Sequence, residues 1–219
     1  MSFGELKEVK EVAMKFKREI QIFWQMGVSS KQIEFVKWAI LLFLRHVRVE
    51  DKIEVTFGQS FRLSKYKQKR PSEWKGFMDA DKIFEFLKNK QKIDGNKYYS
   101  VLLVHNKIFF NQDGERSEIA GLGQSDAVAI VHVDQPKKID TYYTRAYIVG
   151  VLMHELGHIF HLINESRTYN VTLYKGCKHC SRKTCVMYPI VISTGLDLEK
   201  TPFCFSCLFE LRNFFIEND

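Results

Sequence analysis

The amino-acid sequence predicts a single α/β domain with a cysteine-rich C-terminal part. Helical and strand-like hydrophobic patterns alternate along residues 5–163, as they do in α/β folds. The 219 residues, 45% of them hydrophobic, suit one domain that can bury a sizeable core. All five cysteines lie in one short stretch, from Cys177 to Cys207, which sets the C-terminal part apart from the rest.

The first elements form a βαβ unit. Apolar residues at helical spacing predict a helix over 5–17, and strict alternation predicts a strand over 19–24. A helix follows over 29–47, which either of the two serines at its start can cap. Alternation returns over 52–57, so residues 19–57 read as strand, helix and parallel strand.

The middle of the chain continues the α/β pattern. A turn at 70–71 precedes a helix over 79–89. Strands are expected over 98–104, 108–110 and 127–133, the last of them after a glycine-rich turn at 121–123.

Two more helices complete the predicted order. The first is long, has an apolar interior and spans 141–163, and the second lies near 207–215. The chain therefore divides into an N-terminal helix in 1–18, an α/β part over 19–163, and a C-terminal part over 164–219.

The positive charge is concentrated in one segment. Net charge is +7, from 33 Lys and Arg against 26 Asp and Glu, and residues 62–97 hold eleven of these cations against five acids. A basic stretch can bind nucleic acid, but only Tyr66 and Trp74 stand near its start as stacking groups. We therefore interpret it as a solvated surface and expect no nucleic-acid partner.

The sequence predicts a cytoplasmic monomer without a membrane span. The longest apolar run, 38–44, is far too short to cross a bilayer, and the N-terminus lacks the apolar stretch of a secretory signal. In that compartment, five clustered cysteines indicate metal binding rather than a disulfide framework.

The motif that carries chemistry is HExxH, at His154, Glu155 and His158 within the long predicted helix. Spacing i, i+4 puts both imidazoles on one helical face, where they can hold one Zn²⁺. Glu155 projects beside them and can take a proton from a zinc-bound water.

A second set of residues follows this helix. His179-Cys180 begins a run with the spacing H-C-x4-C-x-M and a later C-x-x-C, formed by Cys180, Cys185, Met187, Cys204 and Cys207. Joined to HExxH, this combination resembles the archaemetzincins, a metzincin-related family of zinc metallopeptidases.

The resemblance implies a metzincin-like α/β fold with a mixed β-sheet, an active-site helix carrying HExxH, and a zinc-binding C-terminal part. It further implies two zinc ions. One is catalytic and bound by three histidines above a methionine turn at Met187, and the other is structural. The structural ion would be bound by Cys180, Cys185, Cys204 and Cys207.

The third histidine is where this sequence departs from the family pattern, HExxHxxGxxH. Counted from His158, the family's glycine falls on His161 and its third histidine on Asn164. His179 matches the family's His-Cys step instead, 21 positions after His158 where the family has six, which implies an insertion of fifteen residues. We expect His179 to be the third ligand. His161 is the alternative if the helix breaks at 160 or 161, and a differently completed site is the remaining one.

Two further assignments stay open on the residues alone. Cys177, Cys180, Cys204 and Cys207 also form a plausible zinc ribbon, which would leave Cys185 over. Met187 can be plain core packing rather than a methionine turn.

The predicted activity is zinc-dependent hydrolysis of peptide bonds. A zinc-bound water, with Glu155 as general base, attacks the carbonyl, and Glu155 then passes the proton to the leaving amine. A peptide or protein substrate would pair with a strand edge at 108–110 or in the strand after it. The alternatives are a catalytically inactive zinc protein of the same fold and a basic zinc-containing protein that binds nucleic acid.

Overall fold

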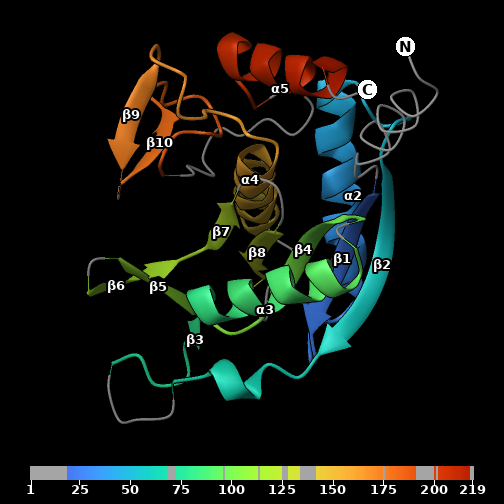
Figure 1. Cartoon of the computed structure of the whole chain (residues 1–219), viewed down its shortest axis with the longest axis vertical. Coiled ribbons are helices and arrows are strands. Elements are labelled where there is room, and N and C mark those ends of the chain that lie inside the picture. Colours follow the sequence, from blue (N-terminus) through green and yellow to red (C-terminus); the bar gives the residue numbers. More distant parts are fainter. Residues whose placement is uncertain are drawn as a thin grey trace, which may run out of the picture.

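The computed structural model describes residues 19–68, 73–95, 97–112, 114–124, 128–133, 142–174, 176–190, 200 and 202–217. The predicted helix over 5–17 and the predicted turn at 70–71 lie outside these residues. A five-stranded sheet of order β2-β1-β4-β8-β7 occupies the centre of the fold (Figure 1). Its strands are β1 (Glu19–Gln25), β2 (Glu54–Phe61), β4 (Tyr99–Val104), β7 (Gly121–Gln124) and β8 (Val128–His132).

The predicted βαβ unit is confirmed. Strands β1 and β2 pair in parallel, starting at Glu19 and Glu54, and α2 (Ser30–Val47) connects them. Ser29 caps α2 in a capping box: its hydroxyl accepts from the Gln32 amide at 3.3 Å, and the Gln32 side chain accepts from the Ser29 amide at 2.9 Å. Local capping and alternation are enough to specify this unit.

The sheet is mixed, as expected. Strands β2, β1, β4 and β8 are parallel to one another, whereas β7 pairs antiparallel with β8 and forms the edge. The predicted turn at 121–123 is wrong, because these residues lie in β7, where Gly121 opposes Val131. Its two glycines resemble turn residues, but here they let a helix approach the strand closely.

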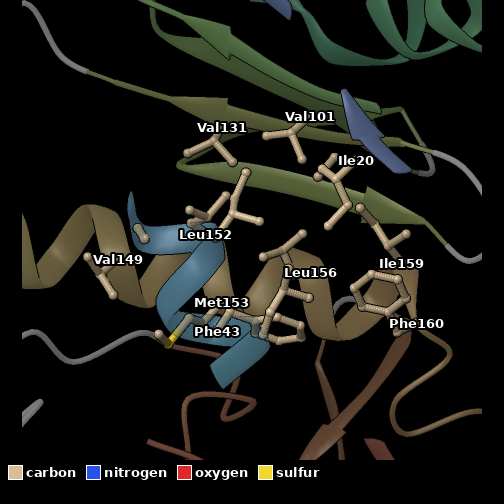
Figure 2. Close-up of a cluster of buried hydrophobic side chains, with 14 of the residues drawn as sticks. Ile20, Phe43, Val101, Val131, Val149, Leu152, Met153, Leu156, Ile159 and Phe160 are labelled. Carbon is tan, nitrogen blue, oxygen red and sulfur yellow. The ribbon is translucent and has the colours of Figure 1, made fainter. Parts of the chain in front are cut away.

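Helices cover both faces of the sheet. On one face α2 and α4 (Tyr142–Ile159) pack against Ile20, Val101 and Val131, and Figure 2 shows Leu152 and Leu156 of α4 within this core. On the other face α3 (Ala80–Ile93) covers Leu102 and Val104. All six residues of β4 are buried, since both of its faces are covered.

Helix α4 ends earlier than the sequence predicts. Its last residue is Ile159 rather than residue 163, and His161 and Ile163 have left-handed φ values of 57° and 59°. The Leu162 amide donates to the Gly157 carbonyl at 2.9 Å, which closes the turn. Hydrophobic periodicity continues past 159, but this turn redirects the chain.

Two small sheets and a last helix complete the fold. Strand β5 (Ile108–Gln112) lies between β3 (Met78–Asp79) and β6 (Glu115–Ile119), and a 3₁₀ turn spans Ser64–Tyr66. Strands β9 (Val171–Tyr174) and β10 (Cys177–Cys180) form a hairpin that begins in the predicted insertion and ends at His179 and Cys180. Helix α5 (Phe205–Glu217) lies across the end of α2 (Figure 1). Among the helices described, none is both long and apolar enough to span a bilayer.

Candidate metal centres

Three imidazole rings converge beside α4. His154 and His158 lie one turn apart on α4, and β10 places His179 against both of them. The nitrogens that the three rings offer all lie within 4.8 Å of one another, with 3.2 Å between Nε2 of His154 and Nε2 of His158. Three nitrogens at this separation form one face of a tetrahedral zinc site. We refer to this cluster as the histidine centre.

Backbone carbonyls orient two of the three rings. The Nδ1 of His154 lies 2.8 Å from the Val186 carbonyl oxygen, and the Nδ1 of His179 lies 3.1 Å from the Cys177 carbonyl oxygen. Each Nδ1–H therefore donates to a carbonyl, which leaves the Nε2 lone pair free to bind a metal.

Burial keeps the three rings neutral. It lowers the pKa of His154 to about 4, and it lowers the pKa values of His158 and His179 as well. His154 is only 6% exposed and His179 only 7%. A neutral imidazole is the form that binds a cation, so at neutral pH the centre has the protonation state that a divalent metal needs.

Glu155 lies between the histidine centre and the edge strand β7. It is 7% exposed, and burial raises its pKa to about 8, although the Gly123 amide donates to the carboxylate and opposes the shift. A cation on the neighbouring imidazoles would favour the charged carboxylate and lower that pKa again. Burial and the cation thus act on the pKa in opposite directions, and a carboxyl group whose pKa lies between these limits can both accept and release a proton.

The two glycines of β7 make room for Glu155. A Cβ atom on Gly121 would lie 2.6 Å from Oε1 of Glu155, and one on Gly123 would lie 2.5 Å from its backbone oxygen. Neither position accepts a side chain without displacing the glutamate. Neither glycine was predicted to be a site residue, although two glycines spaced two apart share one face of a strand.

Met187 lies directly beneath the HExxH helix. It is fully buried, and a Cβ atom on Gly157 would collide with its sulfur. The Met187 carbonyl accepts from the Cys180 amide at 2.9 Å, and the Tyr188 amide donates to the Cys185 carbonyl at 2.9 Å. Met187 thus lies in a tight turn that supports α4 and adjoins the cysteines.

Four of the five cysteines form a second cluster, the cysteine centre. The sulfurs of Cys180, Cys185, Cys204 and Cys207 lie within 4.8 Å of one another. Cys177 is exposed and stands outside the cluster, so the alternative ribbon that includes Cys177 in place of Cys185 is not assembled.

Backbone amides point at the sulfurs of the cysteine centre. The Arg182 amide donates to the Cys180 sulfur at 3.5 Å, and the Cys204 amide donates to the Cys185 sulfur at 3.4 Å. Hydrogen bonds from the Cys185 and Cys207 thiols and from the Arg182 amide lower the pKa of Cys180. The same thiol hydrogen bonds raise the pKa values of Cys185 and Cys207, so without a metal the cluster favours a thiolate at Cys180. Four converging sulfurs suit a closed structural zinc site.

His161 and Asn164 do not join the histidine centre. The helix breaks where His161 would have to turn towards the metal, but its ring instead stacks on Phe214 of α5 at 5.7 Å between centroids. His161 has a left-handed backbone conformation, which a glycine would adopt with less strain.

Arg167 is another residue that the sequence analysis missed. Its guanidinium is buried and donates to the Cys207 sulfur at 3.3 Å and to Glu210 at 3.1 Å. No motif marks it, since an arginine in a loop normally lies in solvent.

These features define a class: an α/β protein with a mixed five-stranded sheet and two residue clusters that could bind zinc. A search of family profiles and a search of curated proteins both find no match. Among solved structures, the chain is similar to archaemetzincin from Methanopyrus kandleri, with a TM-score of 0.60 and 18% identity over 90% of this chain and 95% of that one.

A second archaemetzincin, from Archaeoglobus fulgidus and complexed with malonate, superposes as well. Its TM-score is 0.58 at 18% identity, over 88% of this chain and 99% of that one. The chain therefore has the archaemetzincin fold, and the resemblance read from the sequence is confirmed at the level of the fold.

Proposed function

We propose that the protein is a zinc-dependent peptidase in which Glu155 handles the protons. The observation that carries this proposal is the convergence of His154, His158 and His179 next to a buried glutamate on the same helix. The fold supports this proposal as well, because the chain resembles archaemetzincins, and that resemblance implies a zinc metallopeptidase.

The donor sets fit two zinc ions of different kinds. Three neutral imidazoles, two of them with Nδ1 bonded to a backbone carbonyl, leave positions open for water and substrate, as in catalytic sites. Four sulfurs close the coordination shell, as in structural sites. When bound, zinc at the histidine centre would supply Lewis acidity, polarising a carbonyl and acidifying a water molecule.

The chain's own groups account for the remaining chemistry. We assign Glu155 to take the proton from the attacking water and to deliver it to the leaving amine. The Gly123 amide holds the carboxylate, and its hydrogen bond limits the rise in pKa that burial causes. The Val186 and Cys177 carbonyls keep two of the imidazoles in the metal-binding tautomer.

Strand β7 is the edge along which we place the substrate. It is the last strand in the order of the main sheet, and Gly121 and Gly123 put it in contact with Glu155. An extended peptide added to this edge would pass the histidine centre, with backbone hydrogen bonds holding it in register. The edge predicted from the sequence was 108–110 or the strand after it, over 127–133. We propose β7 instead of either, because β7 contacts Glu155.

A catalytically inactive metal protein of the same fold is the second candidate. Two observations favour it: the third histidine lies on the hairpin β9–β10 instead of six residues after His158, and a histidine occupies the left-handed position 161 where the family has glycine. Both candidates predict metal binding, so only catalysis separates them.

We also propose that the protein acts on peptides or proteins as a monomer in the cytoplasm. The five cysteines are free thiols, four of them in a site for which reduced sulfur is essential. A reducing compartment preserves such thiolates as metal ligands.

The decisive experiment compares Glu155→Gln with the parent and with Glu165→Gln. Glu165 is a matched control, because its side chain is 94% exposed and lies on the loop after α4. We expect Glu155→Gln to retain zinc and to lose peptide cleavage, measured by mass spectrometry on a peptide library, while Glu165→Gln cleaves like the parent.

The outcomes are unambiguous once the zinc content has been measured. Cleavage by Glu155→Gln at the parent rate would overturn the role of Glu155. A parent protein that holds zinc at both centres and cleaves no peptide in the library would favour the inactive metal protein.

A further inference from the structure

Arg167 is a buried cation beside the cysteine centre. Its side chain is only 2% exposed, and Nη1 donates both to the Cys207 sulfur at 3.3 Å and to Oε2 of Glu210 at 3.1 Å. Its Nε donates to the Tyr169 carbonyl at 2.9 Å. Its Nη2 donates to the Asn170 carbonyl at 3.5 Å, so four different residues hold the guanidinium in one orientation.

Burial of this charge needs a compensating charge. A guanidinium taken out of water is costly unless it is paired, and Glu210, with 26% of its side chain exposed, supplies one negative charge. A divalent ion bound by four thiolates carries a formal charge of −2, which is itself unfavourable in the interior. Arg167 therefore places a buried positive charge between Glu210 and such a metal–thiolate group, which offsets part of the negative charge of that group, and the sulfur of Cys207 is the point of contact.

The same network reaches the turn that ends the HExxH helix. Oε2 of Glu210, which accepts from Arg167, also accepts from the Ile163 amide at 3.3 Å. Ile163 has a left-handed φ of 59°, so this hydrogen bond holds a strained position four residues after Ile159. The cation beside Cys207 is thereby tied to the backbone behind the histidine centre.

We propose that Arg167 is a positioning residue of the cysteine centre, which stabilises the metal-bound thiolate of Cys207 by compensating its charge. The inference rests on the proposed zinc binding at that centre and does not depend on peptidase activity. Arg167 occupies the second coordination sphere, where loss of a partner typically weakens metal binding about 10- to 100-fold.

The experiment is a titration of the metal-free protein with Co²⁺, followed through the thiolate-to-cobalt charge-transfer absorbance. That absorbance arises only at the cysteine centre, because the histidine centre contributes no sulfur. The variants are Arg167→Met, Arg167→Lys and the matched control Arg182→Met. Arg182 has the same charge, its side chain is exposed, and its contact with Cys180 is made by the backbone amide, which the substitution preserves.

We expect Arg167→Met to bind Co²⁺ at this centre about 10- to 100-fold more weakly than the parent. Arg167→Lys should lie between them, since lysine keeps the charge on Cys207 but loses the Nε and Nη2 hydrogen bonds to the Tyr169 and Asn170 carbonyls that orient the guanidinium. Arg182→Met should match the parent. Equal affinities for Arg167→Met and Arg182→Met would overturn the proposal.

Two further outcomes keep the test decisive. If Arg167→Met does not fold, Arg167→Lys decides, and an affinity equal to that of Arg182→Met again overturns the proposal. A parent without the thiolate absorbance would overturn it by removing the metal from the cysteine centre. If Arg167→Met weakens Co²⁺ binding as expected in a protein that shows no peptidase activity, this inference stands while the proposed function fails.

Discussion

Replacement of His179 by alanine tests which residue completes the histidine centre. The substitution removes one of three imidazoles whose nitrogens lie within 4.8 Å of one another and leaves His154 and His158 in place on α4. Because β10 continues from His179 to Cys180, the cysteine centre should keep its metal and preserve the fold of the hairpin. The perturbation is therefore confined to one ligand.

The magnitude follows from the free energy of a zinc site. Structural zinc in small proteins binds with about 10–16 kcal/mol over four ligands, so one ligand contributes about 2.5–4 kcal/mol. At about 1.4 kcal/mol per factor of ten, zinc affinity should fall about 10²- to 10³-fold. The Cys177 carbonyl already orients the His179 ring, so zinc binding requires little reorganisation of this ligand and the ring contributes its full share of the binding free energy.

His161→Ala is the matched control. It removes the same kind of side chain from the turn after α4, where the His161 ring stacks on Phe214 at 5.7 Å and lies outside the metal cluster. We expect unchanged zinc affinity and a loss of stability of about 0.5–1.5 kcal/mol, the usual value of an aromatic contact.

The assay is zinc content at graded free zinc, set by a competing chelator, with thermal unfolding as a check on the fold. A parent-like affinity in His179→Ala, or a larger loss in His161→Ala than in His179→Ala, would refute the assignment. Equal and negligible effects in both variants would point to a centre of two histidines and favour the inactive metal protein.

Three more predictions test the surroundings of the two centres. Gly157→Ala should lower the free energy of unfolding by about 1 kcal/mol, because overpacking against Met187 costs about 1–3 kcal/mol and the gain in helix propensity returns about 1 kcal/mol. Calorimetry should show a melting temperature lower by about 2–4 °C, and an increase would contradict the close contact. Gly121→Ala should abolish peptide cleavage with zinc content unchanged, since the new Cβ displaces the Glu155 carboxylate, and undiminished turnover would argue against this packing. Dialysis against a chelator should remove zinc in two phases, from the open histidine centre first and from the closed cysteine centre later, from a starting value of about two ions per chain. A single phase, or one ion per chain after gentle purification, would count against two distinct centres.

Local signals predicted most of the main sheet and its helices. The βαβ unit is encoded by alternation in its strands and by the Ser29 cap, both of which act within a few residues. The buried strand β4 and helix α3 were found near their observed bounds for the same reason. Such patterns predict an element well when the residues that specify it lie within the element or next to it in the chain.

The errors occurred where distant contacts override local preference. Gly121 and Gly123 favour a turn by composition, yet pairing with β8 and the contact with Glu155 make them an edge strand. Helix α4 stops at Ile159 because the next residues pack towards α5, where His161 meets Phe214 and Ile163 meets Glu210. Apolar and polar residues do not alternate clearly in β9 and β10, so the sequence predicted an insertion of fifteen residues here but neither of the two strands.

The sequence by itself determined the chemistry available to this protein. The spacing of HExxH places two imidazoles and a carboxylate around one turn of any helix, because helical geometry is independent of the rest of the fold. The clustering of the cysteines indicated metal binding, and the resemblance to archaemetzincins indicated the fold; both inferences rest on short motifs in the chain.

Only the tertiary structure decided how these groups are combined. His179 instead of His161 meets the helical pair, Cys185 instead of Cys177 completes the four sulfurs, and Arg167 lies against Cys207 across forty residues of chain. Each of these choices depends on the path of the backbone after Ile159, which local propensities do not specify. Metal-ligand geometry and burial act through space, so residues far apart in the chain, once brought together, define the site.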